Sequence, residues 1–210
     1  HPRIAYPTYD VGARLAGAMP LPADAVADWA GNPAVKLVWV NSPSNPTGAV
    51  ASTEYLTQVV EAARSIGALV ASDECYAELA WDEPYASQGV PSVLDPAVRG
   101  ASTDVVLALY SLSKQSNLAG YRAAFAAGDA HVIATLLEAR KHIGMIMPAP
   151  VQAAMVAALR DEEHVAAQKA VYAQRRAVLS EALLDAGFTI DDSQAGLYLW
   201  ASRGEDCWTT

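Results

Sequence analysis

The sequence is poor in cysteine, in clustered basic residues and in long apolar runs, and each shortage excludes a class of protein. Its 210 residues include two cysteines, Cys75 and Cys207, without CxxC or Cys/His spacing, so we expect neither a disulfide framework nor a metal site. The 14 Lys and Arg residues face 23 Asp and Glu residues, and the net charge of −9 argues against nucleic acid or an anionic membrane as partner. No apolar run reaches the roughly 20 residues of a membrane span and no signal peptide is visible, so we expect a cytoplasmic protein.

What is abundant is apolar sequence broken into short runs. The composition, 52% hydrophobic and 18% charged, is typical of a globular protein with a large core. Continuous apolar runs that alternate with helical patterns are typical of a parallel sheet buried on both faces. The sequence therefore predicts an α/β fold with a mostly parallel sheet flanked by helices. The predicted strands are 35–41, 68–74, 104–110 and 122–128, and the predicted helices are 10–18, 52–67, 129–144, 149–161 and 161–186.

A second, smaller unit is expected near the C-terminus. Gly187 ends the last helical run, and the segments 188–192 and 196–201 then predict two strands of another sheet. We expect a large domain over residues 1–160, and a connecting helix with the start of a small α/β domain over residues 161–210. Because the chain starts with His1 and its end carries no finishing element, we expect both domains to be incomplete.

Polar residues gather where the predicted strands end, which is where ligands bind in open α/β sheets. Taken singly, each has an ordinary interpretation: a surface lysine, a solvated acid, a turn made of Asn, Pro and Gly, or a packed tyrosine. Taken together, they form a set that independent loops are not expected to produce. The set comprises Tyr6, Asn45, Asp73, Tyr76, Ser111, Ser113, Lys114 and Arg122.

The chemistry of this set fits one cofactor. A lysine that loses its proton on desolvation forms a Schiff base with an aldehyde. Hydroxyl groups and a guanidinium suit a phosphate dianion. A carboxylate can pair with a protonated pyridine nitrogen, and a lysine Schiff base with such an acidic partner is the signature of pyridoxal phosphate.

Three motifs in order carry a family resemblance over nearly the whole chain. The phrases "NPTG", "DECY" and "SLSKQSNLAGYRAA" resemble those of the fold-type I pyridoxal-phosphate enzymes, in particular the class I/II aminotransferases. The resemblance implies that Lys114 is the Schiff-base lysine and the acid/base of the proton shift, and that Asp73 binds the pyridine nitrogen. It further implies phenolic-oxygen ligands Tyr76 and Asn45, phosphate ligands Ser111 and Arg122 with Ser113 beside them, and Tyr6 stacked on the ring.

The resemblance also implies an activity. Enzymes of this family move an amino group between an amino acid and a 2-oxo acid, and they are typically homodimers. Within the family, "AYPTYDVGARLAGA" and "SDECYAEL" are similar to phrases of actinobacterial succinyldiaminopimelate aminotransferases. This similarity predicts N-succinyl-LL-diaminopimelate and 2-oxoglutarate as substrates, in lysine biosynthesis. The family's phosphate loop and N-terminal arm would precede His1, and its substrate-carboxylate arginine would follow Thr210.

Several alternatives share the same motifs. A C–S β-lyase and an aspartate or aromatic aminotransferase would carry the same cofactor residues. A regulatory module that binds pyridoxal phosphate would need a DNA-binding segment upstream, and the acidic charge gives this interpretation no support. A structural domain with a vestigial site is disfavoured because no expected cofactor residue of the covered region is missing.

Overall fold

The computed structural model describes residues 1–144 and 146–206, and its centre is a four-stranded sheet in the order β1-β2-β3-β4. The first three strands are parallel, and the last is antiparallel to β3. The predicted α/β fold with a mostly parallel sheet is therefore confirmed, as are its four strands. Their bounds are β1 Leu37–Asn41, β2 Leu69–Asp73, β3 Val106–Ser111 and β4 Ala124–Gly128.

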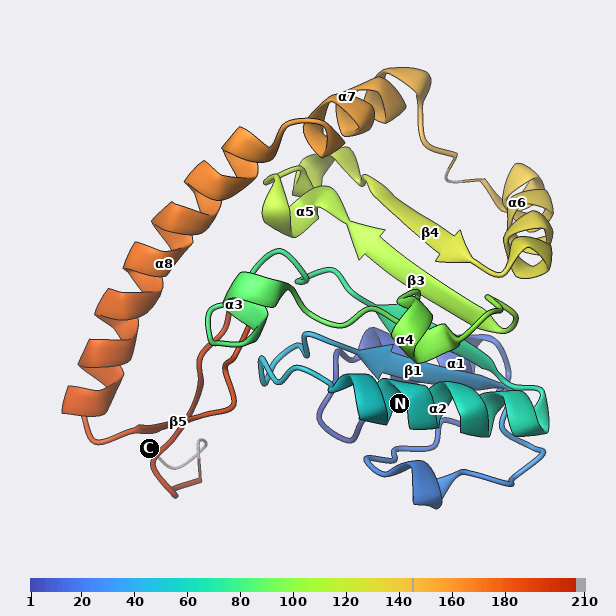
Figure 1. The fold of residues 1–210 in the computed structure, drawn as a ribbon, viewed down its shortest axis with the longest axis horizontal. Coiled ribbons are helices and arrows are strands. Elements are labelled where there is room, and N and C mark those ends of the chain that lie inside the picture. Colours follow the sequence, from blue (N-terminus) through green and yellow to red (C-terminus); the bar gives the residue numbers. More distant parts are fainter. Residues whose placement is uncertain (145, 207–210) are drawn as a thin grey trace.

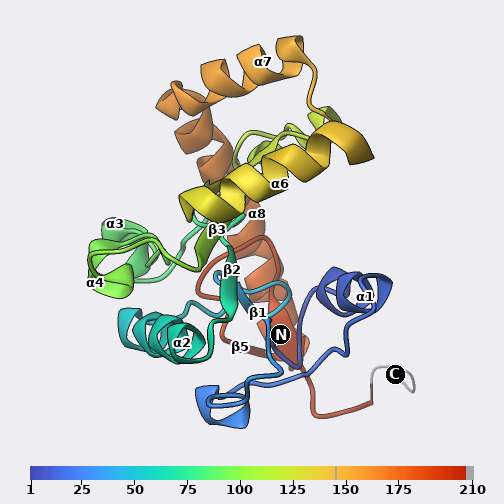
Figure 2. The ribbon, with the colours of Figure 1, turned by 90° about the vertical axis from the view of Figure 1, so that its right-hand side faces the viewer.

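Helix α2 (Thr53–Ile66) covers one face of this sheet because one of its faces is apolar. Ser52 caps its N-terminus by accepting a hydrogen bond from the Tyr55 amide at 3.2 Å, and Gly67 ends it at φ +66°. Figure 2 shows α2 on one side of β1 and β2 and α1 on the other. The side chains that α2 buries are Leu56, Val59, Val60 and Ala63.

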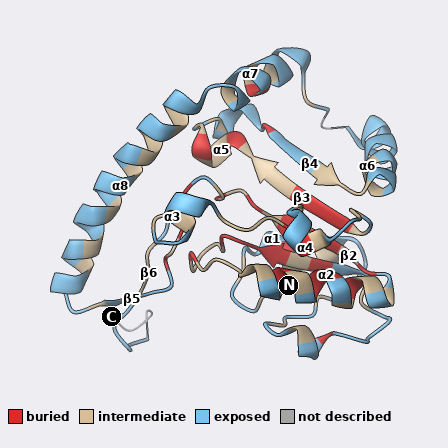
Figure 3. Ribbon diagram, viewed as in Figure 1, coloured by how far each residue is buried: buried red, intermediate tan, exposed pale blue. Residues whose placement is uncertain are grey.

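The main core lies between α2 and the parallel strands. Val60 of α2, Val70 of β2 and Val106 of β3 are fully enclosed. Figure 3 shows that buried residues gather on β1, β2 and the first half of β3, whereas α6 and α8 are largely exposed. The sheet end where β3 runs into α5 has a separate, smaller cluster around Leu112.

Helix α1 (Thr8–Leu15) begins earlier than predicted. The sequence predicted a helix from residue 10, but the helix already begins at Thr8, with Pro7 as its N-cap. This expectation was wrong because a proline at a helix start loses no hydrogen bond: its missing N–H would have no intrahelical partner there. The earlier start turns the side chain of Tyr9 into the interior, where it is 4% exposed.

The C-terminal part consists of the long helix α8 (Glu162–Asp185) and a two-stranded sheet of β5 (Thr189–Asp191) and β6 (Trp200–Ser202). Both strands are shorter than predicted, because residues 193–196 form backbone hydrogen bonds with residues 47–48 and 79–82 instead of with a partner strand. Figure 1 shows α8 running along the side of the molecule from α7 to β5. The division at residue 160 stays a prediction, and Cys207 lies outside the described residues.

The remaining elements connect these units. Within residues 1–144 and 146–206, no helix has both the length and the hydrophobicity to cross a membrane. The region 77–102 contains two single-turn helices, α3 and α4. The connecting elements are η1 Val26–Asp28, α3 Tyr85–Gln88, α4 Pro96–Arg99, α5 Leu112–Gln115, η2 Ala119–Tyr121, α6 Ala130–Ile143 and α7 Ala149–Leu159.

Candidate functional site

Most of the predicted site residues lie at or just after the carboxyl ends of the parallel strands. Asn41 ends β1, Asp73 ends β2, and the two are paired in the strand register. Asp73 in turn pairs with Leu109 of β3, two residues before Ser111 ends that strand. Because neighbouring parallel strands end at one edge, the sheet brings together side chains that are widely separated in the sequence.

The carboxylate of Asp73 is held by two donors. The hydroxyl of Tyr9 donates to Oδ2 at 2.7 Å, and the amide of Cys75 donates to Oδ1 at 3.2 Å. Burial, and next the nearby Asp73 charge, raises the pKa of Tyr9 well above its ordinary value, so this tyrosine stays a proton donor. The ring of Tyr9 stacks on Trp39 at 4.7 Å between centroids, which fixes the direction of the hydroxyl.

Tyr9 was missed by the sequence reasoning. It lies 64 residues before Asp73, and its contact requires helix α1 to fold back over the end of the sheet. The signal that could have found it is the pair of tyrosines in "AYPTYD", of which only Tyr6 was assigned a role.

Lys114 is carried by the single helical turn α5, directly after β3. Leu112 and Gln115 are buried and anchor the turn, whereas Lys114 itself is half-buried. Its ammonium nitrogen lies 5.6 Å from the centroid of the Tyr76 ring, a cation–π distance. The structure therefore brings together Tyr76, which follows β2, and Lys114, which follows β3, and both were predicted to bind the same ligand.

The thiol of Cys75 is influenced by both charges of the site. Burial contributes most to raising the pKa of this thiol, and the carboxylate of Asp73 raises it further, whereas Lys114 lowers it. A raised pKa keeps Cys75 a neutral thiol, so it is a poor nucleophile here.

Tyr76 is buried and has an aromatic partner from the C-terminal part. Burial, and then a side-chain hydrogen bond with Tyr198, raises the pKa of Tyr76. The two rings lie 6.2 Å apart edge to face. Tyr198 is 44% exposed and was not predicted, because nothing in its local pattern distinguishes it from an outward-facing residue of a strand.

The loop that bears Asn45 is organised by Asn41. The Oδ1 atom of Asn41 accepts from the Asn45 amide at 2.7 Å, and its Nδ2 atom donates to the backbone oxygens of Asp73 and Pro43, both at 3.2 Å. Asn41 is buried and uses both ends of its amide, as a buried polar side chain must. It thereby ties the loop of Asn45 to the backbone of Asp73.

The predicted phosphate ligands surround the start of α5. Ser111 caps this turn by accepting from the Ser113 amide at 3.2 Å, and the two hydroxyl oxygens lie 2.9 Å apart. Arg122 is exposed, has φ +55°, and donates from Nη1 to the Ala119 oxygen at 2.9 Å. Two hydroxyls and a guanidinium suit a phosphate group.

Tyr6 lies at the exposed rim of this cluster. Its ring is 6.1 Å from that of Tyr9, edge to face, and the residue is 48% exposed. An exposed aromatic beside the Asp73 donor is compatible with stacking on a ligand ring. Its role stays a prediction.

The charged side chains of the cluster form no ion pair with the residues that the structure describes. Within the described residues, no salt bridge involves Asp73, Lys114 or Arg122. A half-buried carboxylate or ammonium, as in Asp73 and Lys114, loses hydration that a ligand of opposite charge would replace, and the exposed guanidinium of Arg122 is accessible to an anion. The donor set therefore fits pyridoxal phosphate, which would bring a pyridinium to Asp73, a phosphate to Arg122 and an aldehyde to Lys114.

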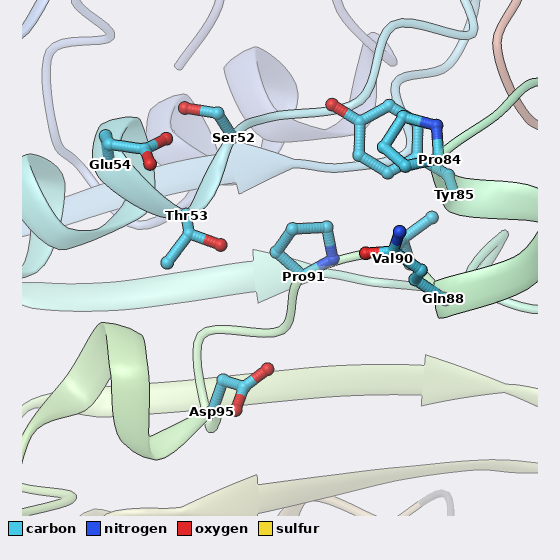
Figure 4. Close-up of a pocket in the computed structure, with 10 residues that line it drawn as sticks. Ser52, Thr53, Glu54, Pro84, Tyr85, Gln88, Val90, Pro91 and Asp95 are labelled. Atoms are coloured by element: carbon cyan, nitrogen blue, oxygen red, sulfur yellow. The ribbon is translucent and has the colours of Figure 1, made fainter.

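One surface cavity lies away from the predicted site residues. A cavity of about 360 Å³ opens beside the first turn of α2 (Figure 4) and contains none of the predicted site residues. In the part of the chain that the structure describes, no group of His, Cys, Asp and Glu could hold a metal ion. The lining of the cavity includes Ser52, Thr53, Glu54, Pro84, Tyr85, Gln88, Val90, Pro91 and Asp95.

Comparisons with known proteins agree with this chemistry. Residues 2–206 match the family described as aminotransferase class I and II. The chain is 54% identical over 207 residues to 4-dedimethylamino-4-oxo-anhydrotetracycline transaminase of Streptomyces rimosus, covering 99% of this chain and 56% of that protein. It is 56% identical over 207 residues to a probable aminotransferase of Mycobacterium tuberculosis, covering 98% of this chain and 48% of that protein.

A solved structure gives the same result at the level of the fold. The probable N-succinyldiaminopimelate aminotransferase of Thermus thermophilus superposes with a TM-score of 0.84 at 30% identity, over 98% of this chain and 56% of that one. The chain thus spans about half the length of the relatives that it matches.

Proposed function

Because the chain belongs to the class I and II aminotransferases, we propose that the protein moves an amino group between an amino acid and a 2-oxo acid, with pyridoxal 5′-phosphate as its cofactor. When bound, this cofactor supplies an aldehyde that takes up the amino group and a cationic ring that accepts electrons. The remaining parts of the catalyst are side chains of the protein.

Each predicted residue has a task in this reaction. Lys114 would hold the cofactor through its aldehyde group, and its amine would carry the proton from the substrate's α-carbon. Proton transfer by a positioned base contributes roughly 10²–10⁴-fold to a rate. Asp73, oriented by Tyr9 and Cys75, would bind the protonated ring nitrogen.

The other ligands orient the ring. Ser111, Ser113 and Arg122 would hold the phosphate, Asn45 and Tyr76 would donate hydrogen bonds to the phenolic oxygen, and Tyr6 would cover one face of the ring. This assignment leaves each cofactor group with a partner of complementary charge or hydrogen-bonding character.

The observation that carries the proposal is the set of unpaired charges at the strand ends. Asp73 ends β2, Lys114 follows β3 and Arg122 precedes β4, and none of the three is neutralised by an ion pair within the described residues. Surface charges scattered by chance would not coincide with the carboxyl edge of a parallel sheet. A ligand with a cationic nitrogen at one end and a phosphate at the other would pair both extremes.

The test compares Lys114→Ala with Lys36→Ala in the full-length protein. Lys36 is exposed and its ammonium donates to the Pro33 oxygen, so its loss should leave the cofactor untouched. We expect Lys114→Ala to lose transamination and cofactor attachment on borohydride reduction, while Lys36→Ala keeps both. Transamination by Lys114→Ala at the wild-type rate would refute the assignment. Release of pyruvate and ammonia without an oxo acid would favour the C–S β-lyase, and cofactor binding without turnover would favour the regulatory module.

For the substrate we propose N-succinyl-LL-diaminopimelate, with 2-oxoglutarate as acceptor, in lysine biosynthesis. The support is the motif similarity and the likeness to the Thermus thermophilus structure. The 54% identity to the Streptomyces rimosus transaminase favours a second candidate, an oxo-tetracycline intermediate. Parallel assays with both substrates, and with aspartate and aromatic amino acids, decide between them by comparing kcat/KM.

We further propose that the full-length protein is a cytoplasmic homodimer. Support for the dimer comes from apolar side chains exposed around α1, because wide exposed apolar patches mark interaction sites. Light scattering of the full-length protein would measure the mass directly, and a monomer at micromolar concentration would refute this point. The exposed side chains are Ile4, Val11, Leu15, Met19 and Leu21.

A further inference from the structure

Residues 193–196, here called the strap, cross from the C-terminal part to the loop of Asn45. The amide of Ser193 donates to the Thr47 oxygen and the amide of Ala195 donates to the Gly48 oxygen, each at 2.9 Å. These bonds lie within the "NPTG" turn itself. The strap therefore holds the loop that carries one predicted ligand of the cofactor's phenolic oxygen.

The other edge of the strap is bonded to the segment that follows Tyr76. The amide of Gly196 donates to the Leu79 oxygen at 2.8 Å, and the amide of Trp81 donates to the Gln194 oxygen at 2.9 Å. The indole nitrogen of Trp81 adds a bond to the Gly196 oxygen at 2.7 Å. The segment that directly follows the turn of the second predicted ligand, Tyr76, is thus held by the same four residues.

One side chain joins the two edges. Gln194 accepts a hydrogen bond from the Val50 amide through Oε1 at 2.9 Å, while its backbone oxygen accepts from Trp81. Gln194 is the member of the strap that touches the Asn45 loop with its side chain and the Tyr76 segment with its backbone.

The fit between strap and loop is close. A Cβ atom on Gly48, which has φ +74°, would lie 2.6 Å from the Ala195 oxygen and 2.8 Å from the Ser193 Cα atom. Ser193 itself is 1% exposed and adopts φ +57°, a conformation that costs free energy in a residue with a side chain. Such a backbone conformation persists only where the surrounding contacts enforce it.

We propose that the strap fixes the position of Asn45 relative to Tyr76, and that Gln194 is therefore a positioning residue for the two hydrogen bonds to the cofactor's phenolic oxygen. This inference rests on the proposed function. It assigns a role in the cofactor site to a segment from the C-terminal part of the chain, beyond the predicted residues. The strap also brings Tyr198 to the Tyr76 ring, two residues past Gly196.

The test compares Gln194→Ala, Gln194→Glu and Gln152→Ala in the full-length protein. Gln194→Ala removes the acceptor of the Val50 amide, whereas Gln194→Glu keeps an oxygen in that position. Gln152, on the exposed side of α7, also makes one side-chain hydrogen bond, from Nε2 to the Met147 oxygen at 2.8 Å, and serves as the matched control. Gly48→Ala is a second perturbation, which pushes the strap away from the loop by steric overlap.

Amide hydrogen exchange without cofactor is the first measurement. Loss of one net hydrogen bond changes a local equilibrium by about fivefold. We expect Gln194→Ala and Gly48→Ala to speed exchange by about this factor at residues 48–51 and 79–82 together, and Gln194→Glu and Gln152→Ala to exchange like wild type. The inference would be overturned if one of the two segments, 48–51 or 79–82, exchanged at the wild-type rate in both Gln194→Ala and Gly48→Ala.

Cofactor binding is the second measurement, because a merely structural role would not move it. We expect Gln194→Ala to bind pyridoxal phosphate about fivefold more weakly and to shift the pH at which the visible absorption of the lysine-bound cofactor changes. Gln194→Glu should restore both. If Gln194→Ala exchanges faster but binds and titrates the cofactor like wild type, the positioning role is overturned. If the wild-type protein does not attach the cofactor, the proposed function is overturned, and this role with it. The exchange result would then still show that the strap holds the two segments.

Discussion

Replacement of Tyr9 by phenylalanine tests how the candidate site is built. The change removes the hydroxyl that donates to Asp73 Oδ2 at 2.7 Å but keeps the ring that stacks on Trp39. A hydrogen bond to a charged group contributes about 1.5–3 kcal/mol, and the partial solvation of Asp73 reduces this to an expected loss of about 1–2 kcal/mol in the free energy of unfolding. For a chain of this size, that loss corresponds to a decrease in Tm of roughly 3–6 °C.

The assay is thermal and urea unfolding of Tyr9→Phe beside Tyr6→Phe. Tyr6 is the matched control because it lies in the same segment and is 48% exposed, so loss of its hydroxyl should change stability by less than about 0.5 kcal/mol. Equal stability of the Tyr9→Phe variant and wild type would refute the reasoning. A loss of cofactor affinity in Tyr9→Phe alone would add that the hydroxyl orients Asp73 for binding.

The pH dependence gives the same prediction a second signature. The pKa of Tyr9 lies above the ordinary value of 10.0, so the folded state keeps its proton where the unfolded chain loses it. The contribution of Tyr9 is therefore fully present below about pH 10 and is lost as the pH rises further. The difference in stability between wild type and Tyr9→Phe should narrow above about pH 10, and a difference that widens there would contradict the assignment.

Two further predictions concern stability away from the ligands. At Gly128, which has φ +139°, a Cβ atom would lie 2.0 Å from the Val106 oxygen, so Gly128→Ala should lower the free energy of unfolding in urea by at least about 3 kcal/mol. Gly12 lies inside α1 with open space around it, so the control Gly12→Ala should raise the free energy of unfolding by about 0.5–1 kcal/mol. Equal effects of the two changes would contradict this prediction. Burial raises the pKa of Glu74, whose Oε1 accepts from the Val93 amide at 2.9 Å, so stability should fall as the pH rises from about 4.5 through the folded-state pKa. Glu74→Gln keeps the acceptor without the charge, and it should be more stable than wild type at pH 7 and lack this decline; a less stable variant would contradict this account.

The strands could be predicted from the sequence because a buried strand is indicated by consecutive apolar residues. "VKLVWVN" and "DVVLALY" are continuous apolar runs, as strands covered on both faces must be. The carboxyl ends of such runs also identify Asp73 and Lys114, since the polar residue that follows a buried strand is adjacent in sequence. No three-dimensional knowledge is needed for this step.

The contacts that orient these residues could not be predicted in the same way. Tyr9 reaches Asp73 across 64 residues, and Gln194 reaches Val50 across 144. Neither residue lies in a periodic pattern that indicates an inward direction. The early start of α1 adds a second reason, because one proline is compatible both with extended backbone and with a helix N-terminus.

The unpaired charges of the site follow from the rigidity of the elements that carry them. Asp73 is fixed by the end of β2 and by Tyr9, and Lys114 by the turn α5, whose buried Leu112 prevents it from sliding along the sheet. Flexible side chains on a free surface would relax into ion pairs or into water. Here the carboxylate of Asp73 and the ammonium of Lys114 lie farther apart than the 4.0 Å of a salt bridge. A site held apart in this way needs little reorganisation when a ligand of matching charges enters, and preorganisation of this kind strengthens binding by lowering its entropic cost.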